Sequence, residues 1–144
     1  MTVTIYALAI GSNVKREHWI AFARQQLALL GQCQWSRTYE IPCRDGKGAD
    51  YYNLAVLLHS ALSLTALDQQ LKQLEQQAGR IRPSHHIPLD IDVIASGASL
   101  QHMQIVAKKL PLAFDVCLPL SELWRDCPGS TERNRFKILN EALK

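Results

Sequence analysis

The hydrophobic pattern of the first part of the chain alternates between runs typical of strands and spacings typical of helices. Residues 3–10 form a nearly continuous apolar run that stops at Gly11-Ser12-Asn13, which predicts a strand followed by a turn. From Glu17 to Leu30, apolar residues recur three or four positions apart. This spacing predicts an amphipathic helix, and Gly31 is a natural place for it to end.

The middle of the chain repeats this order. It predicts two strands, a helix and a further strand, which we place at residues 34–39, 52–60, 63–78 and 89–95. Ser63 and Thr65 are alternative N-caps for the helix, and Gly79 would end it.

The C-terminal part is less regular. We expect short strands at residues 103–106 and 116–118 and a closing helix at residues 132–143. The predicted order is β-α-β-β-α-β followed by a C-terminal extension. That order is typical of the ferredoxin-like α+β fold, an antiparallel sheet with helices packed on one face. A chain of 144 residues fits one domain, residues 1–144.

Composition narrows the class of protein further. Hydrophobic residues make up 47% of the chain and the net charge is +3, so we expect a globular protein that binds no nucleic acid but suits a polyphosphate ligand. The sequence has no apolar run long enough to span a membrane and no export signal, which predicts a cytoplasmic protein that contacts no membrane. Its four cysteines are widely spaced and are expected to be reduced thiols. We expect a monomer.

Asp90 and Asp92 are the clearest chemical signal. Residues two apart in a strand project from the same face, so the two carboxylates would repel each other unless a cation lies between them. Magnesium accepts such oxygen ligands together with phosphate oxygens, and paired magnesium ions hold triphosphates for in-line displacement. The alternative is that both acids lie on a solvated edge strand.

Neighbouring residues bear on that choice. Arg80 and Arg82 precede the acids by a short loop and suit phosphate oxygens, although arginines after a helix also complement its dipole. Tyr51 and Asn53 open the third strand, where a ring can stack on an aromatic side chain and an amide can pair with a heterocycle. The alternative for Tyr51 and Asn53 is a core tyrosine beside a turn residue.

Five segments in order resemble the 6-hydroxymethyl-7,8-dihydropterin pyrophosphokinase family of folate biosynthesis, over about residues 3–97. The segments are Ala9-Ile10-Gly11-Ser12-Asn13, Ser36-Arg37-Thr38-Tyr39-Glu40-Ile41-Pro42, Tyr51-Tyr52-Asn53-Leu54-Ala55-Val56, Leu74-Glu75-Gln76-Gln77-Ala78-Gly79-Arg80-Ile81-Arg82 and Leu89-Asp90-Ile91-Asp92-Val93-Ile94. The resemblance implies a transferase, a kinase that moves the β,γ-diphosphate of ATP to the pterin hydroxymethyl group and releases AMP.

The resemblance also implies roles for single residues. Asp90 and Asp92 would hold two Mg2+ ions, with Arg80 beside them as a further catalytic residue. The pterin would contact Asn53, Tyr51, Ile41, Pro42 and, if the register shifts by one residue, Phe114. The nucleotide would contact Glu75, Arg80, Arg82 and Lys108. The implied partners are small molecules, ATP and a hydroxymethyl-dihydropterin.

The sequence departs from the family where ATP should be held. The loop at residues 83–88 is shorter, and Ile87 stands where the family has an arginine. Lys108 replaces a histidine, Ala113 replaces an arginine, and Ile41 replaces a threonine. Two functional hypotheses therefore remain. The chain is a divergent pyrophosphokinase, or it is a catalytically impaired or altered-substrate paralogue that binds a pterin or a nucleotide.

Overall fold

The computed structural model describes residues 2–129 and 136–139. Within them the chain forms seven strands, three α-helices and two short 3-10 helices. In order, these are β1 (Thr4–Ser12), α1 (Arg16–Ala28), β2 (Gln32–Trp35), β3 (Tyr39–Ile41), β4 (Tyr51–Ser60), α2 (Leu64–Gln77), β5 (Asp90–Gly97), η1 (Leu100–His102), β6 (Gln104–Ile105), η2 (Ala107–Lys109), α3 (Phe114–Leu123) and β7 (Lys137–Ile138).

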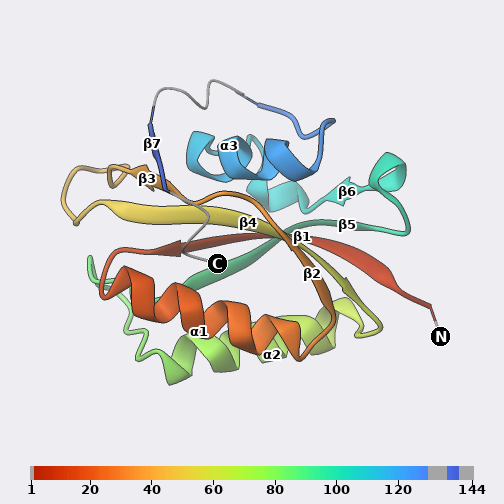
Figure 1. Cartoon of the computed structure of the whole chain (residues 1–144), viewed down its shortest axis with the longest axis horizontal. Coiled ribbons are helices and arrows are strands. Elements are labelled where there is room, and N and C mark those ends of the chain that lie inside the picture. The colour runs from red at the N-terminus through yellow and green to blue at the C-terminus, as the bar shows by residue number, and fades with distance from the viewer. Residues whose placement is uncertain (1, 130–135, 140–144) are drawn as a thin grey trace.

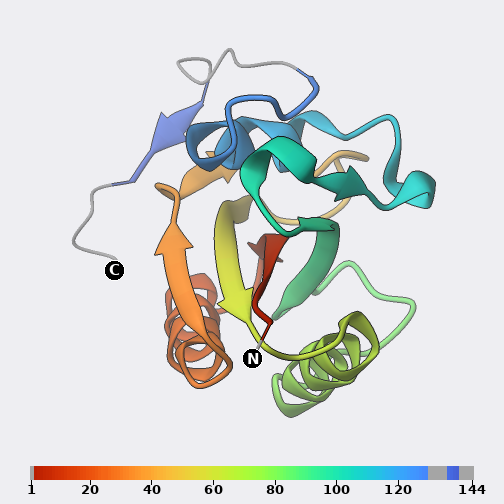
Figure 2. The ribbon, with the colours of Figure 1, turned by 90° about the vertical axis from the view of Figure 1, so that its right-hand side faces the viewer.

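The strands form one antiparallel sheet in the order β6-β5-β1-β4-β3-β7, and β2 also pairs with β4. Helices α1 and α2 lie side by side against one face of this sheet (Figures 1 and 2). The predicted β-α-β-β-α-β arrangement is therefore confirmed. Helix α3, which belongs to the C-terminal extension, covers the opposite face, so the expectation that helices lie on one face alone holds only for α1 and α2.

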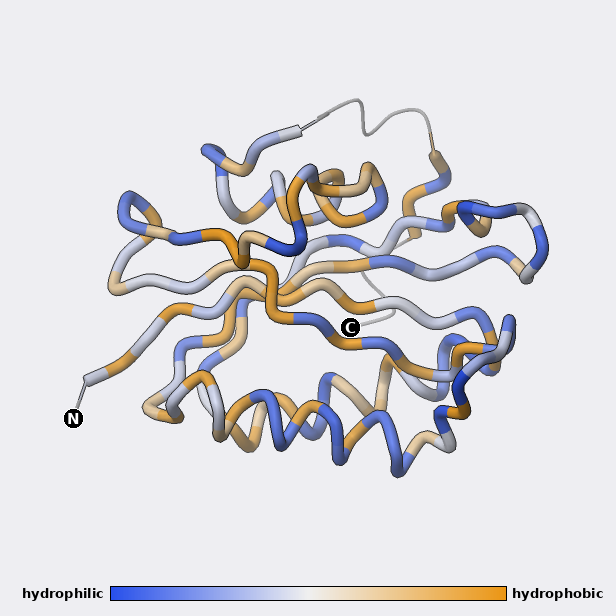
Figure 3. The backbone as a smooth tube through the Cα atoms, turned by 180° about the vertical axis from the view of Figure 1, so that it is seen from behind, coloured by the Kyte–Doolittle hydropathy of each residue, from blue (hydrophilic) through white to orange (hydrophobic). Residues whose placement is uncertain are grey.

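The two faces of the sheet are built from different side chains. In β1, Tyr6, Leu8 and Ile10 alternate onto the α1/α2 face and join the larger core. On the α3 face the same strand presents Ala7 and Ala9. Figure 3 shows the helices under the sheet alternating between hydrophilic and hydrophobic residues, as expected for helices with one buried side. The small residues on the α3 face leave room above the strand ends that larger side chains would fill.

Local signals explain where the second helix begins and ends. Ser63, not Thr65, is the N-cap of α2, and its hydroxyl accepts a hydrogen bond from the Ala66 amide at 3.1 Å. Gly79 follows the helix with a φ of 83°, a left-handed conformation that glycine adopts without strain. Because the helix ends just before Arg80, this glycine sets the point from which Arg80 and Arg82 extend as a loop.

The predicted strand at residues 34–39 is interrupted. β2 ends at Trp35 and β3 begins at Tyr39. Between them, Ser36 bonds to β4 through both its backbone and its side chain. Its amide donates to the Ala55 carbonyl at 2.9 Å, while the Ala55 amide donates to the Ser36 hydroxyl at 2.8 Å. Because a side chain replaces a backbone carbonyl here, the strand ladder breaks and β3 continues separately.

The predictions for the C-terminal part are only partly confirmed. The expected strand at residues 103–106 is confirmed as the shorter β6, but the strand expected at residues 116–118 is wrong. Those residues lie inside α3, because a short apolar run fits either a strand or a buried helix and only packing decides. Most of the closing helix expected at residues 132–143 falls outside the described residues, and the described part contains β7 instead. No helix among the described residues is long and apolar enough to cross a membrane.

Candidate functional site

Asp90 and Asp92 both project from the α3 face of β5. In the sheet register they lie opposite Gly11 and Ala9 of β1, while Ile91 between them turns into the core on the other face. Their side chains are 37% and 40% exposed, respectively. The predicted pair of carboxylates on one face of a half-buried strand is therefore present, on a floor of small residues.

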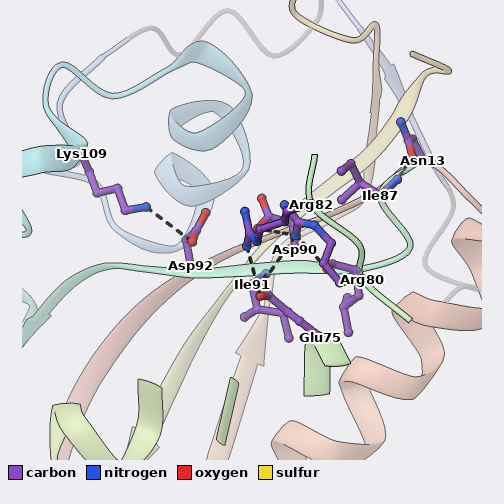
Figure 4. A network of polar contacts seen from close by, with 10 residues as sticks. Asn13, Glu75, Arg80, Arg82, Ile87, Asp90, Ile91, Asp92 and Lys109 are labelled. Atoms are coloured by element: carbon purple, nitrogen blue, oxygen red, sulfur yellow. Dashed lines mark hydrogen bonds and ion pairs between the residues drawn. The ribbon is translucent and has the colours of Figure 1, made fainter. Parts of the chain in front are cut away.

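Each acid is close to one cation. Asp90 lies 3.2 Å from Arg80 Nη1, and Asp92 lies 3.4 Å from Lys109 Nζ (Figure 4). Burial raises the pKa of Asp92, the nearby Asp90 carboxylate raises it further, and Lys109 opposes both effects. The pair is thus a site of concentrated negative charge that the protein offsets with long basic side chains.

Glu75 connects helix α2 to the strand that carries the acids. Its carboxylate accepts a hydrogen bond from the Ile91 amide at 2.8 Å and lies 3.8 Å from Arg80 and 3.6 Å from Arg82. Burial raises the pKa of Glu75 to about 7, although the Ile91 hydrogen bond opposes this shift. Because it is bonded to the backbone between the two acids, Glu75 fixes their position relative to α2.

The two predicted arginines differ in freedom. Arg80 has an 11% exposed side chain and donates to the Leu89 carbonyl at 3.1 Å as well as to Asp90. Arg82 has a 67% exposed side chain and forms an ion pair with Glu75. Arg80 is therefore held in place as a partner of Asp90, whereas Arg82 can reach a ligand.

Two hollows border the acids, and a third lies beside Arg80 and Arg82. The first, here called the Tyr51 pocket, is lined by Cys43, Arg44, Asp45, Tyr51, Asp90 and Asp115. The second, the lysine pocket, is lined by Leu64, Thr65, Asp68, Lys72, Asp92, Val93, Val106, Lys108 and Lys109. The third, the arginine pocket, is lined by Lys72, Glu75, Gln76, Arg80 and Arg82. Asp90 thus faces one hollow and Asp92 another.

Gly11 allows the Tyr51 pocket to form. A Cβ atom at Gly11 would lie 3.1 Å from Asn53 Nδ2 and 3.3 Å from a ring carbon of Tyr51, which is closer than such atoms normally approach. The glycine therefore lets both side chains lie across β1. Asn53 Oδ1 is buried and accepts no hydrogen bond from the described residues. Because buried acceptors nearly always have a donor, this atom is suited to a donor on a ligand.

Asn13, in the turn after β1, holds the loop at residues 83–88. Its side chain donates to the His85 carbonyl at 2.7 Å and accepts from the Ile87 amide at 2.6 Å, and its own amide donates to the Ile87 carbonyl at 2.9 Å. Ile87 is 8% exposed, so its apolar side chain anchors the loop to the protein. The position where the family has an arginine is therefore used for packing.

The remaining predicted residues are not all brought together. Ile41 is fully buried and pairs with Tyr51 across the sheet, while Pro42 is exposed at the start of the following loop. Lys108 lines the lysine pocket. Phe114 is not among the residues that line the Tyr51 pocket. It is 39% exposed and stacks on Phe136, with ring centroids 5.6 Å apart.

Sequence reasoning missed several residues that border the acids. Arg44 and Asp115 form an ion pair at 2.7 Å across a separation of 71 residues, so neither has a local signal that marks it. The sequence marks Lys109 only as the neighbour of Lys108, with which it was expected to contact phosphates as a point charge, and gives no sign of its pairing with Asp92. Lys72 lies between the lysine and arginine pockets, on the exposed side of α2.

The donor set fits magnesium that arrives with a phosphate ligand. Among the described residues no group of three or more His, Cys, Asp or Glu side chains surrounds a possible metal position. The protein therefore offers two carboxylates, and water and phosphate oxygens would supply the rest. Magnesium sites that hold nucleotides commonly have this composition. The repulsion between Asp90 and Asp92 also gives a cation a favourable place to bind.

Comparison with known proteins agrees with this chemistry. The model of the 7,8-dihydro-6-hydroxymethylpterin-pyrophosphokinase family matches residues 7–125. The matched range contains Asp90, Asp92 and the lining residues of all these hollows. No curated protein matches the chain.

Proposed function

The chain belongs to the 7,8-dihydro-6-hydroxymethylpterin-pyrophosphokinase family, and on that premise we propose that it transfers the β,γ-diphosphate of ATP to 6-hydroxymethyl-7,8-dihydropterin. The family's activity is ATP-dependent pyrophosphoryl transfer in folate biosynthesis. The single observation that carries the proposal is the position of the acids: Asp90 lines the Tyr51 pocket and Asp92 lines the lysine pocket. A bound acceptor and a bound nucleotide would meet between them.

On the acceptor side, Tyr51 lines the pocket with its ring, and Asn53, two residues further along β4, has a buried Oδ1 that accepts no hydrogen bond from the described residues. A pterin ring has both a flat aromatic face and ring N–H donors, so it satisfies both groups. Asp90 borders the same pocket, which puts the hydroxymethyl group of the pterin close to the acids. This arrangement supports assigning Tyr51 and Asn53 to the pterin, with Ile41 behind Tyr51 as part of the supporting strand.

On the nucleotide side, Lys72, Lys108, Lys109 and Arg82 surround the hollows beyond Asp92 and Glu75. Basic side chains at these positions would bind the triphosphate and the departing AMP. Lys109, which is paired with Asp92, would become available to a phosphate once a cation occupies the acid. Lys72 and Lys109 extend the predicted nucleotide residues Glu75, Arg80, Arg82 and Lys108.

In the proposed reaction the pterin hydroxyl loses its proton to water and its oxygen bonds to the β-phosphorus of ATP. The bond from that phosphorus to the α–β bridging oxygen breaks, and AMP leaves with that oxygen. Asp90 and Asp92 would hold two Mg2+ ions, which neutralise phosphate charge when bound. Arg80 keeps Asp90 in place, and Glu75 fixes the strand between the acids. Positioning and charge neutralisation supply most of the catalysis in transfers of this kind.

A catalytically impaired or altered-substrate paralogue is the second candidate. Two observations favour it: Ile87 is buried where the family has an arginine, and Phe114 stacks on Phe136 away from the Tyr51 pocket. Such a protein would still bind a pterin or a nucleotide. It would differ from the first candidate in turnover.

One assay separates the two functions. Purified protein is incubated with Mg-ATP and 6-hydroxymethyl-7,8-dihydropterin, and AMP is followed with and without the pterin. Pterin-dependent AMP that is abolished by removing magnesium supports the proposed reaction. If high enzyme concentrations give no AMP, the pyrophosphokinase proposal is rejected, and titration with each ligand then shows whether a binding role remains.

A further inference from the structure

The Tyr51 pocket has a wall that the family resemblance does not account for. Arg44, in the loop after β3, forms a two-pronged ion pair with Asp115 in the first turn of α3. Arg44 Nε lies 2.8 Å from Asp115 Oδ2, and Arg44 Nη2 lies 2.7 Å from Asp115 Oδ1. Both residues line the pocket together with Tyr51 and Asp90.

The pair is more elaborate than a connection between a loop and a helix requires. The loop closes on itself: the Gly46 amide donates to the Cys43 carbonyl at 3.1 Å, and the Lys47 amide donates to Asp45 at 2.9 Å. These bonds do not involve Arg44. Asp115 holds the guanidinium group at the end of the Arg44 side chain, although the side chain as a whole is 60% exposed.

The geometry leaves the guanidinium available to a ligand. Pairing uses Nε and Nη2, and Nη1 donates no hydrogen bond within the described residues. The hydrogen bond to Asp115 raises the pKa of Arg44, so the group stays positively charged. A planar, charged group held in one orientation can stack on an aromatic ring at little entropic cost, because its position is already fixed.

We propose that Arg44 contacts the acceptor and that Asp115 is the positioning residue that holds it there. This inference rests on the proposed function, since it takes the Tyr51 pocket as the acceptor site. The ligand class is a planar, uncharged heterocycle held by the Tyr51 ring and the Arg44 guanidinium, because Asp45, Asp90 and Asp115 also line the pocket and disfavour an anion.

The test uses the full chain and four variants: Arg44→Met, Asp115→Asn, the double variant, and Lys47→Met as a control in the same loop. Binding of 6-hydroxymethylpterin is titrated by its fluorescence, and the KM values for the dihydropterin and for ATP are measured separately. Arg44→Met should weaken acceptor binding about tenfold, which lies between the values for an exposed and a fully desolvated cation–π contact. The KM for ATP and the Lys47→Met variant should be unchanged.

Asp115→Asn tests the positioning role. It should weaken acceptor binding less than Arg44→Met does, and it should have no further effect once Arg44 is methionine, because Asp115 acts through Arg44. If instead the two effects add, or if both variants change only the melting temperature, the pair is structural and the inference is overturned. The double variant also guards against misfolding, since Arg44→Met alone leaves the buried Asp115 carboxylate unpaired, whereas the double variant does not.

The outcomes separate this inference from the proposed function. If the wild-type protein forms AMP but Arg44→Met leaves acceptor affinity unchanged, the inference fails alone. If the wild type forms no AMP yet binds the pterin, and Arg44→Met weakens that binding, the proposed function fails and the inference stands. A wild-type protein that binds no pterin overturns both.

Discussion

The hollows on the two sides of Asp90 and Asp92 are built in opposite ways. In the Tyr51 pocket Arg44 is held through two nitrogens by both carboxylate oxygens of Asp115, and Tyr51 lies close across Gly11. On the other side, Lys72 and Arg82 contact their acids through a single nitrogen, at 3.2 and 3.6 Å, and their side chains are 70% and 67% exposed. The first arrangement suits recognition of a rigid ring, whereas the second suits a flexible polyphosphate.

The difference has a physical basis. A flat ring is recognised by shape and by a few directed contacts, so the groups that contact it gain from being fixed in advance. A triphosphate carries several negative charges, and long basic side chains in water can follow it without a precise geometry. The acids between the two hollows belong to both sides, which gives variants on each side distinct expected effects.

The largest effect should come from removing an acid that the acceptor and the nucleotide are both proposed to need. Asp92→Ala removes one of the two carboxylates proposed to hold magnesium, so we expect AMP formation to fall about 100- to 1,000-fold and magnesium-dependent ATP binding to be lost. The fold should remain intact, because the side chain is 40% exposed and its ion pair is with a surface lysine. The rate is measured by AMP release and the fold by circular dichroism.

Asp68→Ala is the matched control for Asp92→Ala. Asp68 lines the same lysine pocket but is carried by α2, where it pairs with Lys72 at 3.2 Å. Its removal should leave the rate nearly unchanged. If both variants lost activity equally, or if Asp92→Ala kept its ATP affinity, the assignment of the two strand acids to magnesium would be wrong.

The next effect should be confined to the acceptor side. Asn53→Ala removes the buried amide whose Oδ1 accepts no hydrogen bond from described residues, and we expect the KM for the pterin to rise about tenfold. The KM for ATP is the internal control and should not change. Equal rises in both values would show that Asn53 supports the whole site and does not recognise the ring.

A smaller effect should be confined to the nucleotide side. Arg82→Met removes an exposed cation, so the KM for ATP should rise about three- to tenfold, and less at high salt because exposed charges are screened. Arg125→Met, an exposed arginine beyond α3, is the control that should behave like the wild type. A change in the KM for the pterin instead would contradict the division between the two sides.

The smallest effect concerns Glu75, which joins α2 to the acid-bearing strand. Its pKa is raised from 4.5 to about 7 by burial, so its contribution to stability is greatest below pH 4.5 and is lost as the pH rises through 7. The glutamine in Glu75→Gln does not ionise, so the variant does not lose this stability as the pH rises. Its free energy of unfolding relative to wild type should therefore increase from pH 5 to pH 8. Urea denaturation at both pH values measures this difference.

Glu17→Gln, a change at an exposed acid in α1, provides the comparison for the Glu75 experiment. It should show no such trend between pH 5 and pH 8. A Glu75→Gln variant that lost stability relative to wild type as the pH rose would show that the ion pairs with Arg80 and Arg82 outweigh the cost of burying the charge.

Much of the fold could be predicted because its signals are local. The apolar run before Gly11, the helical spacing before Gly31 and the stop at Gly79 each depend on neighbouring residues, and the corresponding elements are present. The strand at residues 34–39 was predicted less well, because a side-chain bond from Ser36 to a distant strand interrupts it. A short apolar run at residues 116–118 fits two structures, and contact with the sheet selected the helix.

For the site, the sequence by itself determined that Asp90 and Asp92 share one face of a strand, because side chains in a strand alternate with a period of two. It also determined that Arg80 and Arg82 directly follow a helix end. Only the tertiary structure decided that Arg44 meets Asp115, that Lys109 meets Asp92, and that Phe114 stacks on Phe136 outside the Tyr51 pocket. These contacts join segments far apart in the chain, and their geometry depends on how the sheet, α3 and the loops pack.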